Sequence, residues 1–209
     1  AMAIFAKRRR LEGPLAPGKR AVRIGVAGSG RSVGATHLAI MTAAYLTGVL
    51  RRRTAVVEQN GHGDFARLAG IYGKKNATKT GEETFSIKDV FFCGRDAQER
   101  LEDCGQGGFE ALVADFGVFG EAIRGEFLSC DFRFLVGSAS EWQLPDFAKA
   151  LSEEGARGRC EFAAAFGDEE ILRMTERTFR VPIRRIPLSA DAFITTGESL
   201  SFFGKVLKW

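Results

Sequence analysis

Val22-Arg23-Ile24-Gly25-Val26-Ala27-Gly28-Ser29-Gly30 joins a short apolar run to a glycine-rich turn. An apolar run of strand length that is closed by glycines predicts a buried first strand. Residues 34–50 are rich in Ala and Leu, lack Pro and lead into Arg51-Arg52-Arg53, which predicts a helix with positive charges at its negative end. Thr54–Glu58 predicts a second strand. The order strand, glycine loop, helix, strand indicates a βαβ unit and therefore a parallel sheet.

The same alternation continues along the chain. We expect a doubly wound α/β fold, a mostly parallel sheet of about six strands with helices on both faces. Further strands are expected at residues 109–116, 131–137, 160–166 and 181–186, and helices at residues 143–154, 168–177 and 200–207.

Composition excludes several classes of protein. With 209 residues, 45% hydrophobic and 27% charged, the chain is expected to be globular rather than disordered or fibrous. The longest apolar run, Leu38–Leu50, has 13 residues, whereas a membrane-spanning helix needs about 20. The 4 cysteines are scattered and form no C-x-x-C pair. We therefore expect neither a zinc site nor a disulfide framework, and a cytoplasmic location.

Positive charge is concentrated near the N-terminus. Residues 1–53 hold eleven Lys or Arg and one acidic residue, a charge of +10, which leaves −6 for the rest of a chain whose net charge is +4. Residues 1–20 mix basic residues with Gly and Pro, which predicts a flexible basic arm before a single domain over residues 21–209. Such an arm suggests weak contact with DNA or with the anionic inner face of a membrane. A solvated tail without a partner is the other interpretation.

The loop between the first strand and the first helix carries the strongest functional signal. Glycines allow a tight turn there and bring backbone N–H groups close to an anion, which the helix N-terminus also attracts. The P-loop pattern G-x-x-x-x-G-K-[ST] fits in part, because Gly34 and Thr36 match and Ala35 replaces the lysine. Losing a charged phosphate donor removes about 1.5–3 kcal/mol of hydrogen bonding, unless Arg31 substitutes for it.

Two other interpretations of this loop stay open. The dinucleotide pattern G-x-G-x-x-G lacks its third glycine at residue 33, yet Glu58 ends the second strand, where a ribose-binding acid would lie. An NAD(P)-binding oxidoreductase is therefore one alternative. A glycine turn that only packs helix against strand is the other, and it would leave an interaction module that binds no nucleotide.

Residues 26–39 resemble the deviant P-loop of the MinD/ParA group of ATPases, particularly the TadZ/CpaE-type pilus-assembly and localisation proteins. Many of those have G-V-G-A-T in place of G-V-G-K-T, and Val33-Gly34-Ala35-Thr36 matches this variant. Glu58-Gln59-Asn60 with Gly63-Asp64 resembles the family's acidic motif after the second strand. Residues 112–117 resemble its Walker B strand, and residues 186–191 its I-P-x-D stretch.

The resemblance implies a P-loop NTPase-like fold with ATP or ADP and Mg²⁺ as cofactors. It implies that Thr36 and Asp115 hold the metal, and that Glu58 and Asn60 occupy switch positions. It also implies a homodimer and protein partners in a pilus or secretion machine. The nucleotide-binding residues implied are Gly28, Ser29, Gly30, Arg31, Ser32, Val33, Gly34, Ala35, Thr36, Glu58 and Asn60.

The chain departs from the family pattern at its charged positions. The family's signature lysine falls at Gly30 and the second loop lysine at Ala35, and the acidic pair after the second strand is reduced to Glu58 and Asn60. We therefore expect a degenerate pseudo-ATPase that acts as a localisation or assembly scaffold, with no residue assigned as catalytic. A weak, active ATPase that relies on Arg31 is the alternative.

Aromatic and histidine residues give weaker signals. The pairs Phe91-Phe92 and Phe202-Phe203, together with Trp142, are expected to exceed what one core hides and to mark a partner surface. His37 is expected to be packed or to face solvent, and His62 is a minor candidate for contact with a ligand.

Overall fold

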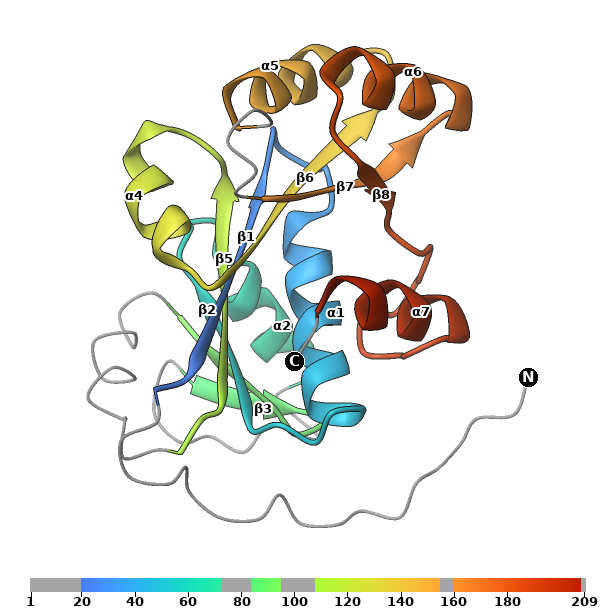
Figure 1. Cartoon of the computed structure of the whole chain (residues 1–209). Coiled ribbons are helices and arrows are strands. Elements are labelled where there is room, and N and C mark those ends of the chain that lie inside the picture. Colours follow the sequence, from blue (N-terminus) through green and yellow to red (C-terminus); the bar gives the residue numbers. More distant parts are fainter. Residues whose placement is uncertain (1–19, 73–83, 95–107, 155–159, 208–209) are drawn as a thin grey trace.

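A computed structural model of the chain describes residues 20–72, 84–94, 108–154 and 160–207 (Figure 1). Within these residues the strands and helices alternate for most of the chain. In chain order they are β1 (Val22–Gly28), α1 (Ala35–Gly48), β2 (Thr54–Glu58), α2 (Asp64–Tyr72), β3 (Thr84–Ile87), β4 (Val90–Cys93), β5 (Ala111–Val118), α4 (Glu121–Ser129), β6 (Phe132–Ala139), α5 (Leu144–Glu154), β7 (Glu161–Gly167), α6 (Glu169–Phe179), β8 (Ile183–Arg185) and α7 (Gly197–Val206).

The described strands form one sheet in the order β3-β4-β2-β5-β1-β6-β7-β8. Strand β1 lies near the middle and pairs in parallel with β5 on one side and β6 on the other. The pairing of β3 with β4 is antiparallel, and the other pairs are parallel. Both faces of a parallel sheet are covered, which explains why β1 is apolar from Ile24 onward, where Ile24 and Val26 have no exposed surface.

Helices cover both faces of the sheet (Figure 1). Helices α1, α2 and α7 share one apolar core with side chains such as Ile24, Val56 and Phe92. Helices α4, α5 and α6 pack on the opposite face, around Phe127 and Phe147. The expected doubly wound α/β architecture is confirmed.

Helix α1 is buried around most of its circumference, because it lies between the sheet and α7. Leu38 and Leu46 are fully buried, and the rings of Tyr45 and Phe203 stack at 4.9 Å between centroids. Full burial of one leucine is worth about 1.5–3 kcal/mol, so this helix is a main part of the core. It ends at Gly48, and its last turn holds no basic residue. The expectation that the arginines at 51–53 complement its C-terminus is therefore wrong; Arg52 instead pairs with Glu110 at 2.6 Å.

The sequence missed the hairpin formed by β3 and β4. Phe85, Ile87, Val90 and Phe92 are buried and follow the two-residue alternation of strands. Lys88 and Asp89 join the strands with positive φ angles of 48° and 68°. Positive φ at both central residues defines the tight hairpin turn that Asn-Gly usually forms. A Lys-Asp pair does not predict this turn from the sequence.

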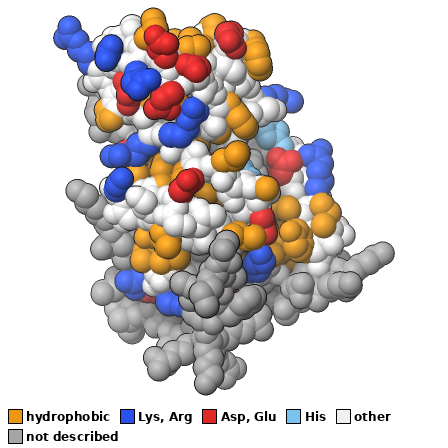
Figure 2. Space-filling view, turned by 90° about the vertical axis from the view of Figure 1, so that its right-hand side faces the viewer, with side chains coloured by type: hydrophobic (Ala, Val, Ile, Leu, Met, Phe, Trp, Pro, Cys, Tyr) orange, Lys and Arg blue, Asp and Glu red, His pale blue; other side chains and the backbone are white. Residues whose placement is uncertain are grey.

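Most of the aromatic residues expected at a partner surface are buried. Phe92, Phe202 and Phe203 expose 7% of their surface or less, so that expectation is wrong for them. Trp142 is 78% exposed, so a partner surface at this residue stays a prediction. On the face shown in Figure 2, hydrophobic side chains lie in several groups separated by polar and charged ones. No helix of the described residues has the length and hydropathy needed to cross a bilayer.

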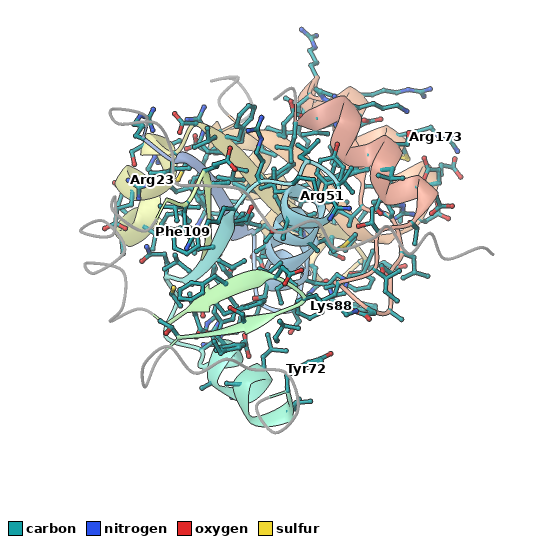
Figure 3. All side chains as sticks on the ribbon, turned by 90° about the horizontal axis from the view of Figure 1, so that it is seen from below. Arg23, Arg51, Tyr72, Lys88, Phe109 and Arg173 are labelled. Carbon is teal, nitrogen blue, oxygen red and sulfur yellow. The ribbon has the colours of Figure 1, made fainter. Side chains whose placement is uncertain are left out.

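The basic residues at both ends of the sheet are largely paired. The Arg53 guanidinium lies over the ring of Phe109, which is labelled in Figure 3, at 5.2 Å from the ring centroid. Arg184 pairs with Glu161 at 3.0 Å and Arg185 with Glu169 at 3.7 Å. Arg53, Arg184 and Arg185 are therefore each engaged by a partner in the same chain.

Asp131 secures the start of β1, and its replacement is expected to destabilise the fold in a pH-dependent way. Its carboxylate accepts from both guanidinium ends of Arg20, at 2.6 and 2.9 Å, and from the Arg23 N–H at 2.9 Å. The bond from Arg20 holds the pKa of Asp131 below its ordinary value.

We predict that Asp131→Asn lowers the free energy of unfolding at pH 7 by about 0.5–1 kcal/mol, because the pair is largely exposed. A lowered folded pKa gives stability that is complete above the unfolded value, about 3.9, and that is lost as pH falls through the folded value. Urea unfolding at pH 7 and pH 3 measures it. An equal loss at both pH values contradicts the prediction.

Candidate functional site

A pocket of about 840 Å³ opens at the carboxyl end of β1. This is where ligands bind in open α/β sheets, because the loops on either side of the central strand diverge there. The walls come from the glycine loop, the start of α1, the β2–α2 connection, the ends of β5 and β7, and the segment after β8. The lining includes Gly30, Arg31, Ser32, Val33, Gly34, Ala35, Thr36, His37, Gly61, His62, Asp64, Arg67, Gly117, Val118, Ala165, Phe166, Ile186, Pro187, Leu188 and Ser189.

The loop needs the glycines at positions 28 and 34. A Cβ on Gly28 would lie 2.7 Å from Val33 Cγ2 and 2.9 Å from the Gly30 carbonyl oxygen. Gly34 immediately precedes α1 with φ +94°, and Ser32 also has a positive φ, 59°. Left-handed backbone at two loop residues curls the chain tightly before the helix starts, which places the backbone of residues 30–36 along the pocket wall.

Neighbouring elements hold the loop in place. Ser29 N–H donates to the Val136 carbonyl in β6 at 2.7 Å, and Phe119 N–H donates to the Gly28 carbonyl at 2.7 Å. The Gln143 side chain donates to the Arg31 carbonyl at 3.1 Å. The loop is therefore shaped before any ligand arrives, which lowers the entropic cost of binding an anion.

Asp115 lies under the loop, in register with Val26 of β1 and Glu58 of β2. It has no exposed surface. Its Oδ1 accepts from the Gly117 N–H at 3.1 Å, whereas Oδ2 has no hydrogen-bond partner among the described residues. Burial raises the pKa of Asp115, and the nearby Thr36 hydroxyl and the Gly117 N–H oppose the rise.

This donor set fits a magnesium ion. Mg²⁺ prefers oxygen ligands and keeps several waters, so one carboxylate and one hydroxyl beside bound phosphates make a sufficient set. The described groups that would hold it are the hydroxyl of Thr36, which lines the pocket, and the unpartnered carboxylate oxygen of Asp115, which is buried outside the lining. No lysine occurs among the described residues of the lining.

Glu58 and Asn60 do not line the pocket; their side chains contact the backbone. Glu58 is 5% exposed, and its Oε1 accepts from the Asp64 N–H, at the start of α2, at 2.7 Å. Burial raises its pKa, and the backbone hydrogen bonds of Asp64 and Phe65 oppose the rise. Asn60 donates to the Asp115 carbonyl at 3.2 Å and accepts from the His62 N–H at 3.0 Å. Both residues position the β2–α2 connection.

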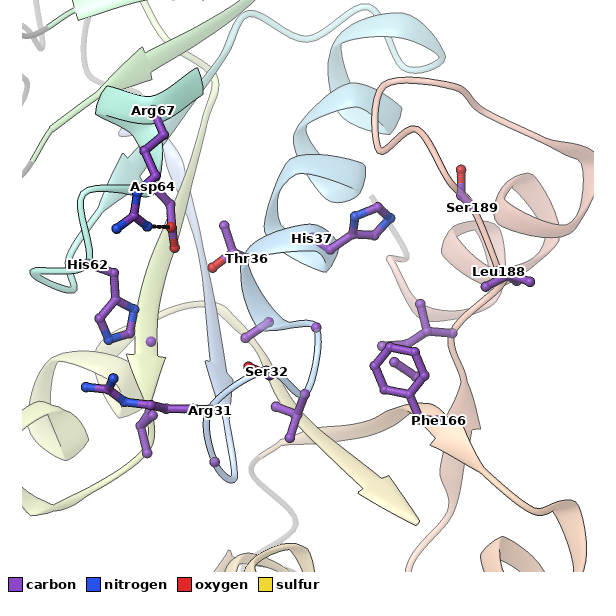
Figure 4. Close-up of a pocket in the computed structure, with 18 of the residues that line it drawn as sticks. Arg31, Ser32, Thr36, His37, His62, Asp64, Arg67, Phe166, Leu188 and Ser189 are labelled. Atoms are coloured by element: carbon purple, nitrogen blue, oxygen red, sulfur yellow. Dashed lines mark hydrogen bonds and ion pairs between the residues drawn. The ribbon is translucent and has the colours of Figure 1, made fainter. Parts of the chain in front are cut away.

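The pocket has a polar end, which holds the charged side chains, and an apolar end, which also carries His37 and Ser189 (Figure 4). Arg31, His62, Asp64 and Arg67 lie on one side of the loop, and Arg67 donates to Asp64 Oδ1 at 2.6 Å. Phe166 and Leu188 lie on the other side, with Ala165, Ile186 and Pro187 also in the lining. Such a cavity suits a ligand with an anionic head and a flat apolar group.

Sequence reasoning did not identify several of these lining residues. Arg67 and Phe166 received no role, His37 was not expected to contact a ligand, and His62 was a minor candidate; all four line the pocket. The signal for His62 was its position between two glycines after the second strand. No sequence pattern marked Arg67, because α2 itself was not predicted.

We predict that Asp115→Asn stabilises the ligand-free protein. Below the unfolded pKa, about 3.9, both states hold the proton and burial carries no charge penalty. Because the folded pKa is raised, the penalty grows between the two values and is complete above the folded one. At pH 8 the variant should gain about 1 kcal/mol in free energy of unfolding, and almost nothing at pH 3.5. Thermal unfolding at the two pH values measures it, and a loss of stability at pH 8 contradicts it.

Comparison with known proteins shows the fold. No protein-family model matches the sequence, and no curated protein sequence is significantly similar to it. Among solved structures, a plasmid partition protein of Borrelia burgdorferi bound to AMPPNP superimposes with a TM-score of 0.59 at 10% identity, covering 90% of this chain and 98% of that one. MinD of Aquifex aeolicus, in a MinC:MinD complex, gives 0.56 at 12% identity over 81% and 83% of the two chains. A ParA family ATPase of Chlorobium tepidum gives 0.53 at 13% identity over 88% and 93%. The chain shares the α/β fold of MinD and ParA P-loop ATPases.

Proposed function

We propose that this chain binds ATP or ADP with Mg²⁺ and acts as a degenerate MinD/ParA-type scaffold that localises or assembles a larger machine, a pilus or a secretion system. The observation that carries the proposal is the glycine loop, curled and hydrogen-bonded at the carboxyl end of β1, above a buried carboxylate with an unpartnered oxygen. The bound AMPPNP of the Borrelia protein and the MinC:MinD complex support a nucleotide ligand and protein partners.

The side chains favour binding over efficient hydrolysis. Both loop lysine positions are small residues, Gly30 and Ala35. Asp64 is the acidic side chain among the described residues of the lining, and its carboxylate is paired with Arg67. Glu58 is bonded to the start of α2. In the ligand-free protein, therefore, the carboxylate of the described lining is already paired, and Glu58 lies outside the lining.

Charge balance in the pocket makes binding depend on the metal. Arg31 and Arg67 are the charged cations of the described lining, and Asp64 offsets one of them, while Asp115, once ionised, adds a negative charge outside the lining. A nucleotide with three or four negative charges is therefore poorly neutralised by the protein alone. A bound Mg²⁺ would supply the missing positive charge. The Thr36 hydroxyl and Asp115 would hold the ion, and the loop N–H groups would orient the phosphates.

Calorimetry with nucleotide tests the proposal directly. Wild type should bind ATP and ADP with Mg²⁺ and lose most of the affinity in EDTA, and Thr36→Ala should lose the metal-dependent part. Ala35→Lys should bind at least about ten-fold more tightly, because the side chain at position 35 borders the pocket and adds a charged donor worth about 1.5–3 kcal/mol.

Two results contradict the proposal. Absence of binding to the wild type at millimolar nucleotide, with binding gained only in Ala35→Lys, would leave an interaction module that binds no nucleotide. Binding of NADH in a fluorescence titration, in preference to ATP, would favour the oxidoreductase, although the Glu58 carboxylate that such an enzyme needs for the ribose is bonded to the backbone.

A nucleotide-dependent homodimer is part of the proposed function. Light scattering should show the mass of the protein rise toward that of a dimer at saturating Mg–ATP. Thr36→Ala is the matched control, because it removes a hydroxyl at the pocket and leaves the rest of the surface intact. If the mass of the wild type is unchanged over the whole range of Mg–ATP concentration, nucleotide-dependent dimerisation is wrong.

The basic arm lies outside the described residues, apart from Arg20, which pairs with Asp131. Its contact with DNA or with an anionic membrane, the division into residues 1–20 and 21–209, and a cytoplasmic location peripheral to the membrane all stay predictions.

A further inference from the structure

We propose that Arg67, on α2, takes the place of the missing loop lysines and binds the terminal phosphate of a nucleoside triphosphate. The inference rests on the proposed function and names the residue that would make the pocket prefer ATP over ADP. It assigns a nucleotide-binding role to α2, a helix that lies outside the glycine loop.

Arg67 lies on the polar side of the pocket with two other basic side chains. Figure 4 shows Arg67, His62 and Arg31 along one side, with the loop and Thr36 facing them. These three come from different segments: α2, the β2–α2 connection and the loop. Among the described lining residues, Arg31 and Arg67 are the permanently charged cations.

Because the two ends of the pocket differ in polarity, a nucleotide is expected to bind in one orientation. A flat base fits the apolar end, beside Phe166 and Leu188. The loop lies between this end and α2 (Figure 4). A polyphosphate that extends from the apolar end across the loop therefore presents its last phosphate to the side that carries Arg67. A shorter diphosphate ends nearer to the loop.

The start of α2 is fixed, so Arg67 is presented at a defined place. The Asp64 N–H donates to Glu58 Oε1 at 2.7 Å, and the Arg67 N–H donates to the Gly63 carbonyl at 3.2 Å. The Arg67 side chain itself is 72% exposed and pairs with Asp64 three residues earlier. Exposed pairs of this kind are weak, so the guanidinium can leave Asp64 for a phosphate, which it binds through two parallel hydrogen bonds.

Calorimetric titration with Mg–ATP and Mg–ADP tests this role. Arg67→Ala should lower the affinity for ATP by about ten-fold or more and change that for ADP by less than about two-fold, since only the longer ligand reaches the guanidinium. Arg67→Lys should recover part of the loss, because it keeps the charge but not the planar fork. Arg173→Ala is the matched control. It removes an exposed arginine of α6, labelled in Figure 3, that is not part of the pocket lining, and it should change neither affinity.

The outcomes separate the two proposals. If wild type binds ATP and Arg67→Ala keeps the same preference for ATP over ADP, the role of Arg67 is wrong and the proposed function stands. If Arg67→Ala weakens both ligands equally and lowers the thermal midpoint, Arg67 is only structural and the inference is also overturned. If wild type binds neither nucleotide, the proposed function fails and this inference falls with it.

Discussion

Parallel pairing of β1 with both β5 and β6 is the constraint on which the rest of this structure depends. Because helices cover both faces of the sheet, the central strand must be apolar on both faces, and β1 is so from Ile24 to Gly28. Its carboxyl end must also lie beside the carboxyl ends of its neighbours. The glycine loop, Asp115 at the end of β5 and the backbone of β6 therefore meet at one edge without any further device. The hydrogen bond from the Ser29 N–H to the Val136 carbonyl follows from this arrangement, since it joins the glycine loop to β6.

The site is the part of the fold that gives up stability. It holds a buried carboxylate with an unpartnered oxygen, a non-glycine residue at positive φ and a second carboxylate whose pKa burial raises. Each of these costs free energy in the absence of a ligand. The apolar core around α1 offsets the cost, since that helix is packed between the sheet and α7. A ligand that satisfies the orphan oxygen would recover part of it.

Six of the eight described strands could be predicted. Five of them contain short apolar runs, and the sixth, β8, falls within the expected range 181–186 although two of its three residues are arginines. The hairpin of β3 and β4 could not, because Lys88 and Asp89 are not the residues that normally mark such a turn, and Phe91 interrupts the polar face. The loop could be located and its missing lysines recognised. The orientation of Glu58 could not, because whether a strand-end carboxylate faces a ligand or caps the next helix depends on where that helix begins.

The amino-acid sequence by itself determined the βαβ start, the parallel sheet and the phosphate-type loop, because these follow from local periodicity and from the backbone freedom of glycine. Only the tertiary structure decided which polar groups share the pocket. Arg67 and Thr36 are 31 positions apart in the chain. Phe166 belongs to β7, which three strands separate from β2 in the sheet. No local pattern records that β2, β5, β1 and β7 end at the same edge, because strand order is set by long-range packing and pairing.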